Sequence, residues 1–426
     1  MRSFVFKSKI WLIIIICCLA FCGPQIFAQN SATPENENTQ TNDEQYPRKR
    51  KSKQTWEVIV SLPGKLVTLP LLIILKSTEA VTTYFDETKI IARLNDIMAS
   101  DDGRRGVFPT YSARTGGGLM FYQKLSQQTA LTLQATAGAK QRQKFQASIK
   151  GFRLGNSATL GLSATYQFLT TEKFYGLGND SRNENESNYA IKQMSFEIPI
   201  AYYLNKSFSI DARIGFESNK IEDGKDSKIP STTDPNLPGL ITDVELSKVQ
   251  LTLRYDGKNH PGRPTSGLEF SLSGGVYNEI SGNEFGFYKT SWNAATYLNL
   301  FYNRVLVLRL AGEITEPLSN RLVPFYHFSE IGQQGTVRGF QRGRFRGPDM
   351  ILGSIEYRYP IWQIIDFTLF VDAGKVSQNI FDELNFDNYH TGYGAGIRIW
   401  GKKGLITKME IGKSKDGYRF QLVLNN

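Results

Sequence analysis

Histidine, cysteine and the serine motifs of hydrolases carry much of enzymatic chemistry, and this chain offers few of them. Its 426 residues include only three histidines, His260, His327 and His390, which lie far apart in the sequence. Neither a G-x-S-x-G nor an H-E-x-x-H pattern occurs, so no hydrolase or zinc-protease constellation is marked. We therefore expect that the protein is not an enzyme, and that it has no catalytic residue, cofactor or metal site.

The first residues, 1–28, have the pattern of a secretory signal peptide. A basic start with Arg2, Lys7 and Lys9 precedes an apolar run from Ile10 to Phe21, and Ala28 is an acceptable cleavage position. The run is too short to serve as a membrane anchor. The sequence therefore predicts export out of the cytoplasm.

All three cysteines of the chain, Cys17, Cys18 and Cys22, lie within this signal segment. Cleavage after Ala28 leaves a mature chain without disulfides or thiolate metal sites. A lipoprotein interpretation remains open, because Leu19-Ala20-Phe21-Cys22 resembles a lipobox with Cys22 as the acylated residue, although Phe21 is bulky. Cleavage also removes three positive charges and lowers the net charge from +10 to about +7, which does not indicate a nucleic-acid partner.

Two further segments precede the main domain. Residues 29–55 are polar and predicted to be disordered, and they end in a basic run, Arg48 to Lys53, that is either a solvated linker or a contact with anionic lipid head groups. Residues 56–103 are predicted to form an amphipathic helical segment, because apolar side chains share one broad face from Leu71 to Met98. This segment is expected to lie in the periplasm, either on the membrane surface or beneath the main domain.

From residue 104 to residue 426 the hydrophobic period changes to two. Apolar and small or polar residues alternate over long stretches, as from Ala158 to Phe168, from Phe208 to Phe216 and from Tyr389 to Ile399. Many stretches reach ten or more residues, longer than the usual strand of about five or six. Together with the signal peptide, they predict an all-β fold in which a transmembrane β-barrel turns its apolar side to lipid.

The number of strands follows from the alternation of tight turns and long loops. Tight turns near Lys124, Leu154, Leu204 and Tyr302 are assigned to the periplasmic side, and long loops to the outside. This order requires a short first strand at Arg104 to Ser112. The count is then sixteen antiparallel strands, eleven before the longest loop, residues 317–349, and five after it.

Four motifs follow in order through the C-terminal part of the chain. They are Gly335 to Phe340 (GTVRGF), Gly353 to Pro360 (GSIEYRYP), Phe370 to Gly374 (FVDAG) and Gly394 to Arg398 (GAGIR). This ordered set resembles the BamA/TamA family of outer-membrane assembly and secretion barrels, also called bacterial surface antigens, whose hallmark is the VRGF motif in the sixth extracellular loop.

Two further segments extend the resemblance. Asp256 to Gly267 resembles the D-x-R-x-x-P-x-x-G turn of the family, and Val107 to Gly118 resembles the barrel entry of members without periplasmic repeats. About 75 residues separate Gln29 from Gly103, enough for at most one polypeptide-transport-associated repeat, and we expect none. The chain also lacks the terminal aromatic residue of a common outer-membrane targeting signal.

The resemblance implies that Arg338 reaches inside the barrel to acidic residues on the strands after its loop. Alternation supplies two candidates, because Glu356 and Asp372 are out of phase with the apolar residues of their strands and so face the lumen. A guanidinium between two carboxylates makes strong charge-assisted hydrogen bonds. The sequence therefore predicts an architectural loop-anchoring motif, Val337, Arg338, Gly339 and Phe340, with Glu356 and Asp372 as its lumenal partners.

A second candidate site is the seam where the first strand meets the last. The first strand is short and carries Val107 and Pro109, and the last carries Tyr418, Phe420 and Leu422. Pro109 lacks a backbone donor, so the seam is expected to pair few hydrogen bonds. The resemblance implies that this seam opens toward lipid and templates client strands, and a merely short edge is the alternative.

The resemblance implies a function, which the barrel pattern alone does not. The first hypothesis is insertion or translocation of proteins or lipids at the bacterial outer membrane. Its expected partners are outer-membrane lipids, unfolded client proteins and a separate periplasmic protein, with no nucleic acid. The alternatives are a passive or gated channel and, less favoured, a structural or adhesive surface protein.

Overall fold

The computed structural model describes residues 98, 100, 102–332, 335–383, 385, 387–401 and 404–424. The predicted signal segment 1–28, the linker 29–55 and nearly all of the helical segment 56–103 lie outside the described residues. No helix within the described part of the chain has the length and apolar character needed to cross a membrane.

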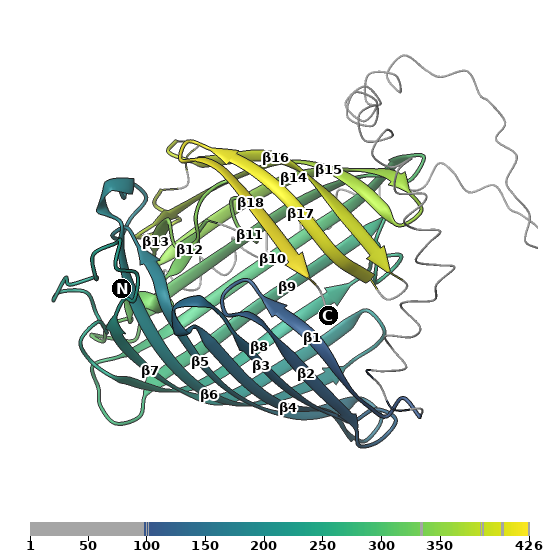
Figure 1. Cartoon of the computed structure of the whole chain (residues 1–426), viewed down its shortest axis with the longest axis horizontal. Coiled ribbons are helices and arrows are strands. Elements are labelled where there is room, and N and C mark those ends of the chain that lie inside the picture. Colours follow the sequence, from purple (N-terminus) through teal and green to yellow (C-terminus); the bar gives the residue numbers. More distant parts are fainter. Residues whose placement is uncertain are drawn as a thin grey trace, which may run out of the picture. The chain divides into compact units, whose positions relative to one another are not determined.

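Sixteen antiparallel strands form one large sheet in which every strand but the two at the edges pairs with its neighbours in the chain order (Figure 1). The strands are β1 (Arg105–Ser112), β2 (Gly116–Lys124), β3 (Ala130–Ala137), β4 (Gln143–Leu154), β5 (Ala158–Phe174), β6 (Ser187–Tyr203), β7 (Phe208–Asp223), β8 (Val244–Asp256), β9 (Gly267–Glu279), β10 (Gly286–Phe301), β11 (Arg304–Pro317), β14 (Asp349–Trp362), β15 (Ile365–Ser377), β16 (His390–Gly401), β17 (Gly404–Ser414) and β18 (Gly417–Leu424).

The strand number and order confirm the count made from turns and loops. Eleven strands precede the longest connection and five follow it. That connection, residues 318–348, contains a small sheet of its own, β12 (Ser329–Ile331) paired with β13 (Phe345–Gly347). The longer connections collect at one end of the sheet, which we call the long-loop end.

The period-two pattern of the sequence appears as two unlike faces of the sheet. In β8, Val249, Leu251 and Leu253 are 58%, 50% and 44% exposed, whereas Thr252 between them is buried. Thr252 and Ser273 of the neighbouring strand β9 are 3.0 Å apart on the buried face. An apolar exposed face and a hydrogen-bonded polar face are the division expected of a strand between lipid and a lumen.

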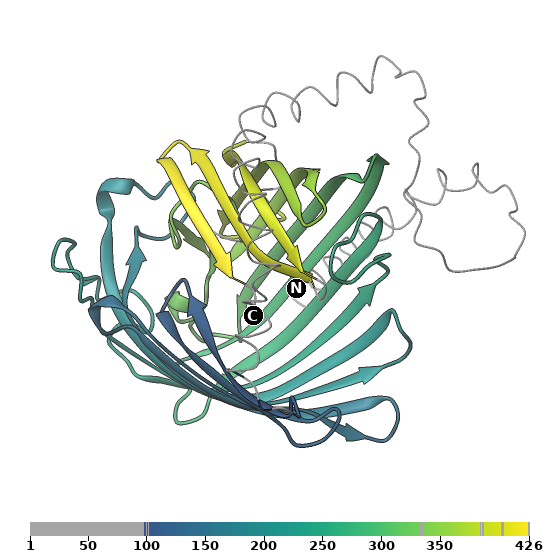
Figure 2. The ribbon, with the colours of Figure 1, turned by 45° about the vertical axis from the view of Figure 1, so that its right-hand side comes forward.

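The sequence predicts that the first and last strands meet, and the structure differs at this point. Within the described residues β1 pairs only with β2, and β18 only with β17, so these two strands are the edges of the sheet. Figures 1 and 2 show the two edges apart, at the dark blue and yellow ends of the curled sheet. Both edge strands have only eight residues, and Pro109 removes a donor from β1, so few backbone groups are available to join them.

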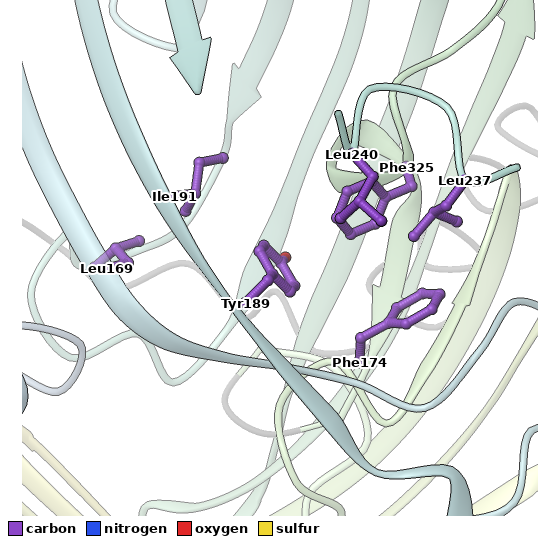
Figure 3. Packing of buried hydrophobic residues seen from close by; sticks show 7 residues of the cluster. All are labelled: Leu169, Phe174, Tyr189, Ile191, Leu237, Leu240 and Phe325. Carbon is purple, nitrogen blue, oxygen red and sulfur yellow. The ribbon is translucent and has the colours of Figure 1, made fainter. Parts of the chain in front are cut away.

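The long connection between β11 and β14 packs against the sheet through Phe325, which lies in the 3-10 turn Phe325–His327. Its ring lies 5.5 Å from that of Phe174 and 5.0 Å from that of Tyr189, both in edge-to-face geometry. Figure 3 shows the surrounding cluster, which consists of Leu169, Phe174, Tyr189, Ile191, Leu237, Leu240 and Phe325. This apolar contact attaches the first half of the connection to β5 and β6. Both strands lie far from the connection in the sequence.

Candidate functional site

The motif Val337 to Phe340 lies in the second half of the same connection, and its apolar residues are fully packed. Val337 and Phe340 belong to a buried cluster with Ile331, Phe345, Leu352 and others. The Phe340 ring meets that of Phe345 at 5.4 Å, and Phe345 stacks on His390 of β16 at 3.6 Å. Through these contacts the motif packs against the wall formed by β14, β15 and β16.

Glycines let the backbone of the motif touch the wall directly. A Cβ atom at Gly392 of β16 would lie 1.8 Å from the carbonyl oxygen of Arg338, and one at Gly412 of β17 would lie 2.7 Å from the nitrogen of Gly339. Gly339 itself has a φ of +95°, which other residues rarely adopt. The hydroxyl of Ser414 donates to the Gly339 carbonyl at 2.8 Å. The glycines of the motif and of the wall therefore hold the loop in place by allowing its backbone to approach, and Ser414 adds a side-chain hydrogen bond.

Arg338 is only 7% exposed and is surrounded by carboxylates. Its Nε and Nη2 donate to the two oxygens of Asp372 at 2.7 and 2.8 Å, and its backbone nitrogen donates to Asp372 at 3.0 Å. Its Nη1 donates to Glu356 and to Glu410, each at 3.0 Å. The structure thus brings the predicted residues Arg338, Glu356 and Asp372 together and adds a third acid, Glu410.

The acids around Arg338 are balanced by further cations that sequence reasoning did not assign. Arg398 of β16 donates to Glu356 at 2.6 Å, and Arg358 of β14 donates to the same carboxylate at 2.9 Å. Lys408 lies 3.0 Å from Glu410. Three carboxylates and four cations therefore form one buried network. The period of two could have placed Glu410 on the inner face, because it alternates with the exposed Ile411 on β17, but it could not have revealed the contact with Arg338.

The ring of Phe370 completes the setting of Arg338, with its centroid 3.5 Å from the guanidinium carbon. Burial opposes the charge of Arg338, but the hydrogen bonds and charge of Asp372, with those of Glu356 and Glu410, outweigh it and raise the pKa of the guanidinium. Arg338 is therefore a permanent cation in this network. The arrangement can hold the loop against the strands.

Comparison with known proteins decides the family. The Omp85 superfamily domain matches residues 127–402, well over half of the chain. The chain belongs to the Omp85 superfamily. This Omp85 barrel is similar in fold to the crystal structure of BamA from Haemophilus ducreyi lacking POTRA domains 1-3, with 15% identity and a TM-score of 0.55 over 75% of this chain and 70% of that one.

Two other solved structures are more distant from this Omp85 barrel. CdiB from Acinetobacter baumannii is 13% identical with a TM-score of 0.45, over 74% of this chain and 58% of that one. CdiB from Escherichia coli is 11% identical with a TM-score of 0.43, over 75% and 60%. None of the curated proteins compared with the chain matches it. The family and the sheet together identify a bacterial outer-membrane β-barrel of BamA/TamA type.

The turn that resembles the D-x-R-x-x-P-x-x-G motif reaches across the other end of this Omp85 barrel. Arg263, between β8 and β9, forms an ion pair with Asp366 of β15 and donates to the carbonyl of Gln363 at 2.6 Å. Trp400 of β16 donates from Nε1 to the same Asp366 at 2.7 Å. The turn therefore ties strands that are distant in the sheet order, a contact that local sequence patterns did not reveal.

The predicted seam residues of this Omp85 barrel lie on the two free edges of the sheet. Val107 and Pro109 are on β1, and Tyr418, Phe420 and Leu422 are on β18. Tyr418 and Phe420 are 66% and 67% exposed, among the most exposed aromatic side chains of the described residues. The structure does not bring the two sets into contact.

The three histidines of this Omp85 barrel occupy separate places. His260 accepts hydrogen bonds from the backbone of its own turn, and His327 lies 2.7 Å from Glu217 on the inner face. His390 stacks on Phe345 and lies 2.9 Å from the Asn179 carbonyl oxygen. Among the described residues no cluster of histidine, cysteine and acidic side chains could hold a metal ion.

Proposed function

We propose that this Omp85 barrel inserts or translocates proteins at the bacterial outer membrane, and that a client strand pairs with the edge of β1 or β18. The observation that carries the proposal is the pair of free edges, since each presents unpaired backbone donors and acceptors. An extended segment can add itself to such an edge as a further strand. The family resemblance points to the same activity.

The composition of the edges supports access from the bilayer. Tyr418 and Phe420 place large exposed rings on β18, and Val107 is 43% exposed on β1. A client strand paired at these edges would find apolar side chains at the level of the lipid. Outer-membrane lipids are therefore proposed as partners alongside unfolded client proteins.

The Arg338 network has an architectural part in this proposal. It fixes residues 318–348 against β14 to β17, next to the β18 edge. A wall stiffened in this way would keep one edge in place while the other edge moves. No proton transfer or bond cleavage is assigned to Arg338, Glu356 or Asp372.

Export and delivery of clients complete the proposal. The basic and apolar start of the chain supports a signal peptide cleaved after Ala28, and acylation of Cys22 is the alternative. Residues 29–55 and 56–103 are proposed as a linker and a helical periplasmic segment without polypeptide-transport-associated repeats. A separate periplasmic protein would then deliver the clients.

A passive or gated channel is the second candidate function. The polar inner face favours it, since side chains such as Gln250, Thr252 and Ser273 hydrogen-bond to one another there. A channel would conduct ions in a planar bilayer without changing the folding of other barrels. Single-channel recording of the purified chain separates this function from assembly, because an assembly factor need not conduct.

We predict that locking the two edges together abolishes assembly. Val107→Cys combined with Phe420→Cys places one thiol on each edge, in a mature chain that otherwise has no cysteine. Oxidation is expected to stop the appearance of new folded outer-membrane proteins, and reduction to restore it, because a closed edge cannot accept a strand. Pulse-labelling of newly folded barrels measures the effect.

The matched control keeps one of the two thiols and moves the other. Val107→Cys with Phe121→Cys joins β1 to β2, which face each other in register already. This crosslink should leave assembly unchanged. Equal assembly in oxidised and reduced cells, once a gel-mobility shift shows that the edge-to-edge disulfide has formed in the oxidised cells, would rule out the edges as the client site.

A further inference from the structure

A polar pocket of about 650 Å³ lies at the long-loop end, apart from the Arg338 network. Its wall is shared by the turn after β1, the connection between β3 and β4, the end of β5 and the segment from β12 to β13. The charged lining residues are Arg114 from the turn, Arg142 before β4, Glu172 and Lys173 from β5, Glu330 of β12, Arg346 of β13 and Arg342 between these two strands.

Cations outnumber acids in this pocket. Its acidic side chains are Glu172 and Glu330, and its cations are Arg114, Arg142, Lys173, Arg342 and Arg346. Lys173 is neutralised by an ion pair with Glu186, which lies outside the pocket. Four arginines therefore remain against two carboxylates.

The two carboxylates orient the arginines without saturating them. Arg114 donates from Nη2 to Glu172 at 2.7 Å, and Arg346 pairs with Glu330. The Nε of Arg342 lies 3.7 Å from Glu330 and 4.0 Å from Glu172, beyond hydrogen-bonding distance. Guanidinium groups are thus held at fixed places with donors left over.

Unused donors on three arginines point to a ligand. The Nε atoms of Arg114, Arg342 and Arg346 are buried and have no hydrogen-bond partner, and Arg346 is only 1% exposed. A buried donor without a partner costs about 1–3 kcal/mol, more for a charged group. An anion with several acceptor oxygens would add charge-assisted hydrogen bonds to the guanidinium groups that line the pocket.

The buried pair of Arg346 and Glu330 is charged at neutral pH. Burial opposes the charge on Arg346, but Glu330 and Tyr189 outweigh it and raise the pKa of the guanidinium. Burial likewise opposes ionisation of Glu330, but Arg346 and Arg342 outweigh it and lower the pKa of that carboxyl. The positive excess is therefore a lasting property of the site.

We propose that this pocket binds a phosphate-bearing anion. Planar guanidinium forks suit the oxygens of phosphate better than those of a halide, and the pocket volume exceeds the need of a single phosphate, so a diphosphate or a phosphorylated head group fits. The phosphate can come from a soluble molecule or from a lipid, because the pocket adjoins Ser112 and Ala113 at the end of the β1 edge. This inference is independent of client assembly and stands if the proposed function fails.

The test is titration of the purified full chain in detergent with inorganic pyrophosphate, followed by calorimetry. Saturable binding is expected, and the combined variant Arg114→Gln with Arg342→Gln should weaken it at least about tenfold, because each arginine supplies a charge-assisted hydrogen bond. Arg254→Gln is the matched control, since Arg254 is a half-exposed arginine paired with Asp211 in the sheet and outside the pocket. This control should bind as the unaltered chain does.

Two further measurements keep the result decisive. Arg142→Gln removes a partly exposed pocket arginine that donates only to the Ala139 carbonyl among the contacts the structure gives it, so folding should be retained while binding weakens. Dihexanoyl phosphatidate is then tested as a competitor of pyrophosphate. Tighter binding of the phosphatidate indicates a lipid head group as the ligand, and tighter binding of pyrophosphate indicates a soluble anion. Absence of saturable binding by either probe, or equal binding by the pocket variants and Arg254→Gln, overturns the proposal.

Discussion

Arg338→Ala is expected to lower the free energy of unfolding of the barrel by about 3–5 kcal/mol, the usual cost of breaking a buried ion pair. The substitution leaves Asp372, Glu356 and Glu410 buried without the cation that all three contact. It also removes the bidentate contact and the stacking on Phe370. The loss of this one side chain therefore destabilises both the loop and the strands β14, β15 and β17 that it contacts.

Two measurements read out this change. Urea unfolding in detergent gives the free energy, and limited proteolysis reports whether residues 318–348 leave the wall. Arg338→Lys keeps the charge but not the fork, so it should restore only part of the stability. Arg254→Ala, at an exposed pair, should cost no more than about 1 kcal/mol. Unchanged stability and protease resistance of Arg338→Ala would refute the anchoring role.

Gly392→Ala is expected to have an effect of similar size, although it adds only a methyl group. The new Cβ would lie 1.8 Å from the Arg338 carbonyl oxygen, and backbone on both sides of the contact leaves no side chain that could turn away. The loop must lift from β16, at a cost of about 3 kcal/mol. We expect faster proteolysis of residues 318–348 and a lower unfolding midpoint.

Gly353→Ala is the matched control for this substitution. Gly353 lies on β14 in the same wall, and a Cβ there would meet nothing within 4 Å. Its stability should stay within about 0.5 kcal/mol of the unaltered chain. If the two alanine variants unfold alike, the close approach of loop and wall is not what holds the loop.

Much of the sheet could be predicted from the sequence because strand structure is local. A hydrophobic period of two residues indicates the strands, and the lengths of the turns and loops indicate their order. Even the short β1 is therefore placed correctly beside β2. The alternation also puts Glu356 and Asp372 on one face, where both contact Arg338. A face can be deduced from a strand alone, because successive side chains point to opposite sides.

Contacts across the sheet could not be predicted in the same way. Glu410 joins the network from β17 because the sheet curls, and curvature depends on all strands at once. Arg263 reaches Asp366 across several strands for the same reason. The separation of β1 from β18 is likewise a property of the whole sheet, since Pro109 predicts weak pairing at this edge but not the distance between the two edges.

Depletion of the protein from its own cells tests the central claim most directly. Quantification of the folded outer-membrane proteins and of the surface lipids during depletion should show selective loss of one client or lipid class before growth stops. Re-expression of the unaltered chain should restore that class, and the oxidised edge-to-edge cysteine variant should not. An unchanged outer-membrane proteome and lipid composition would contradict the account and favour the channel.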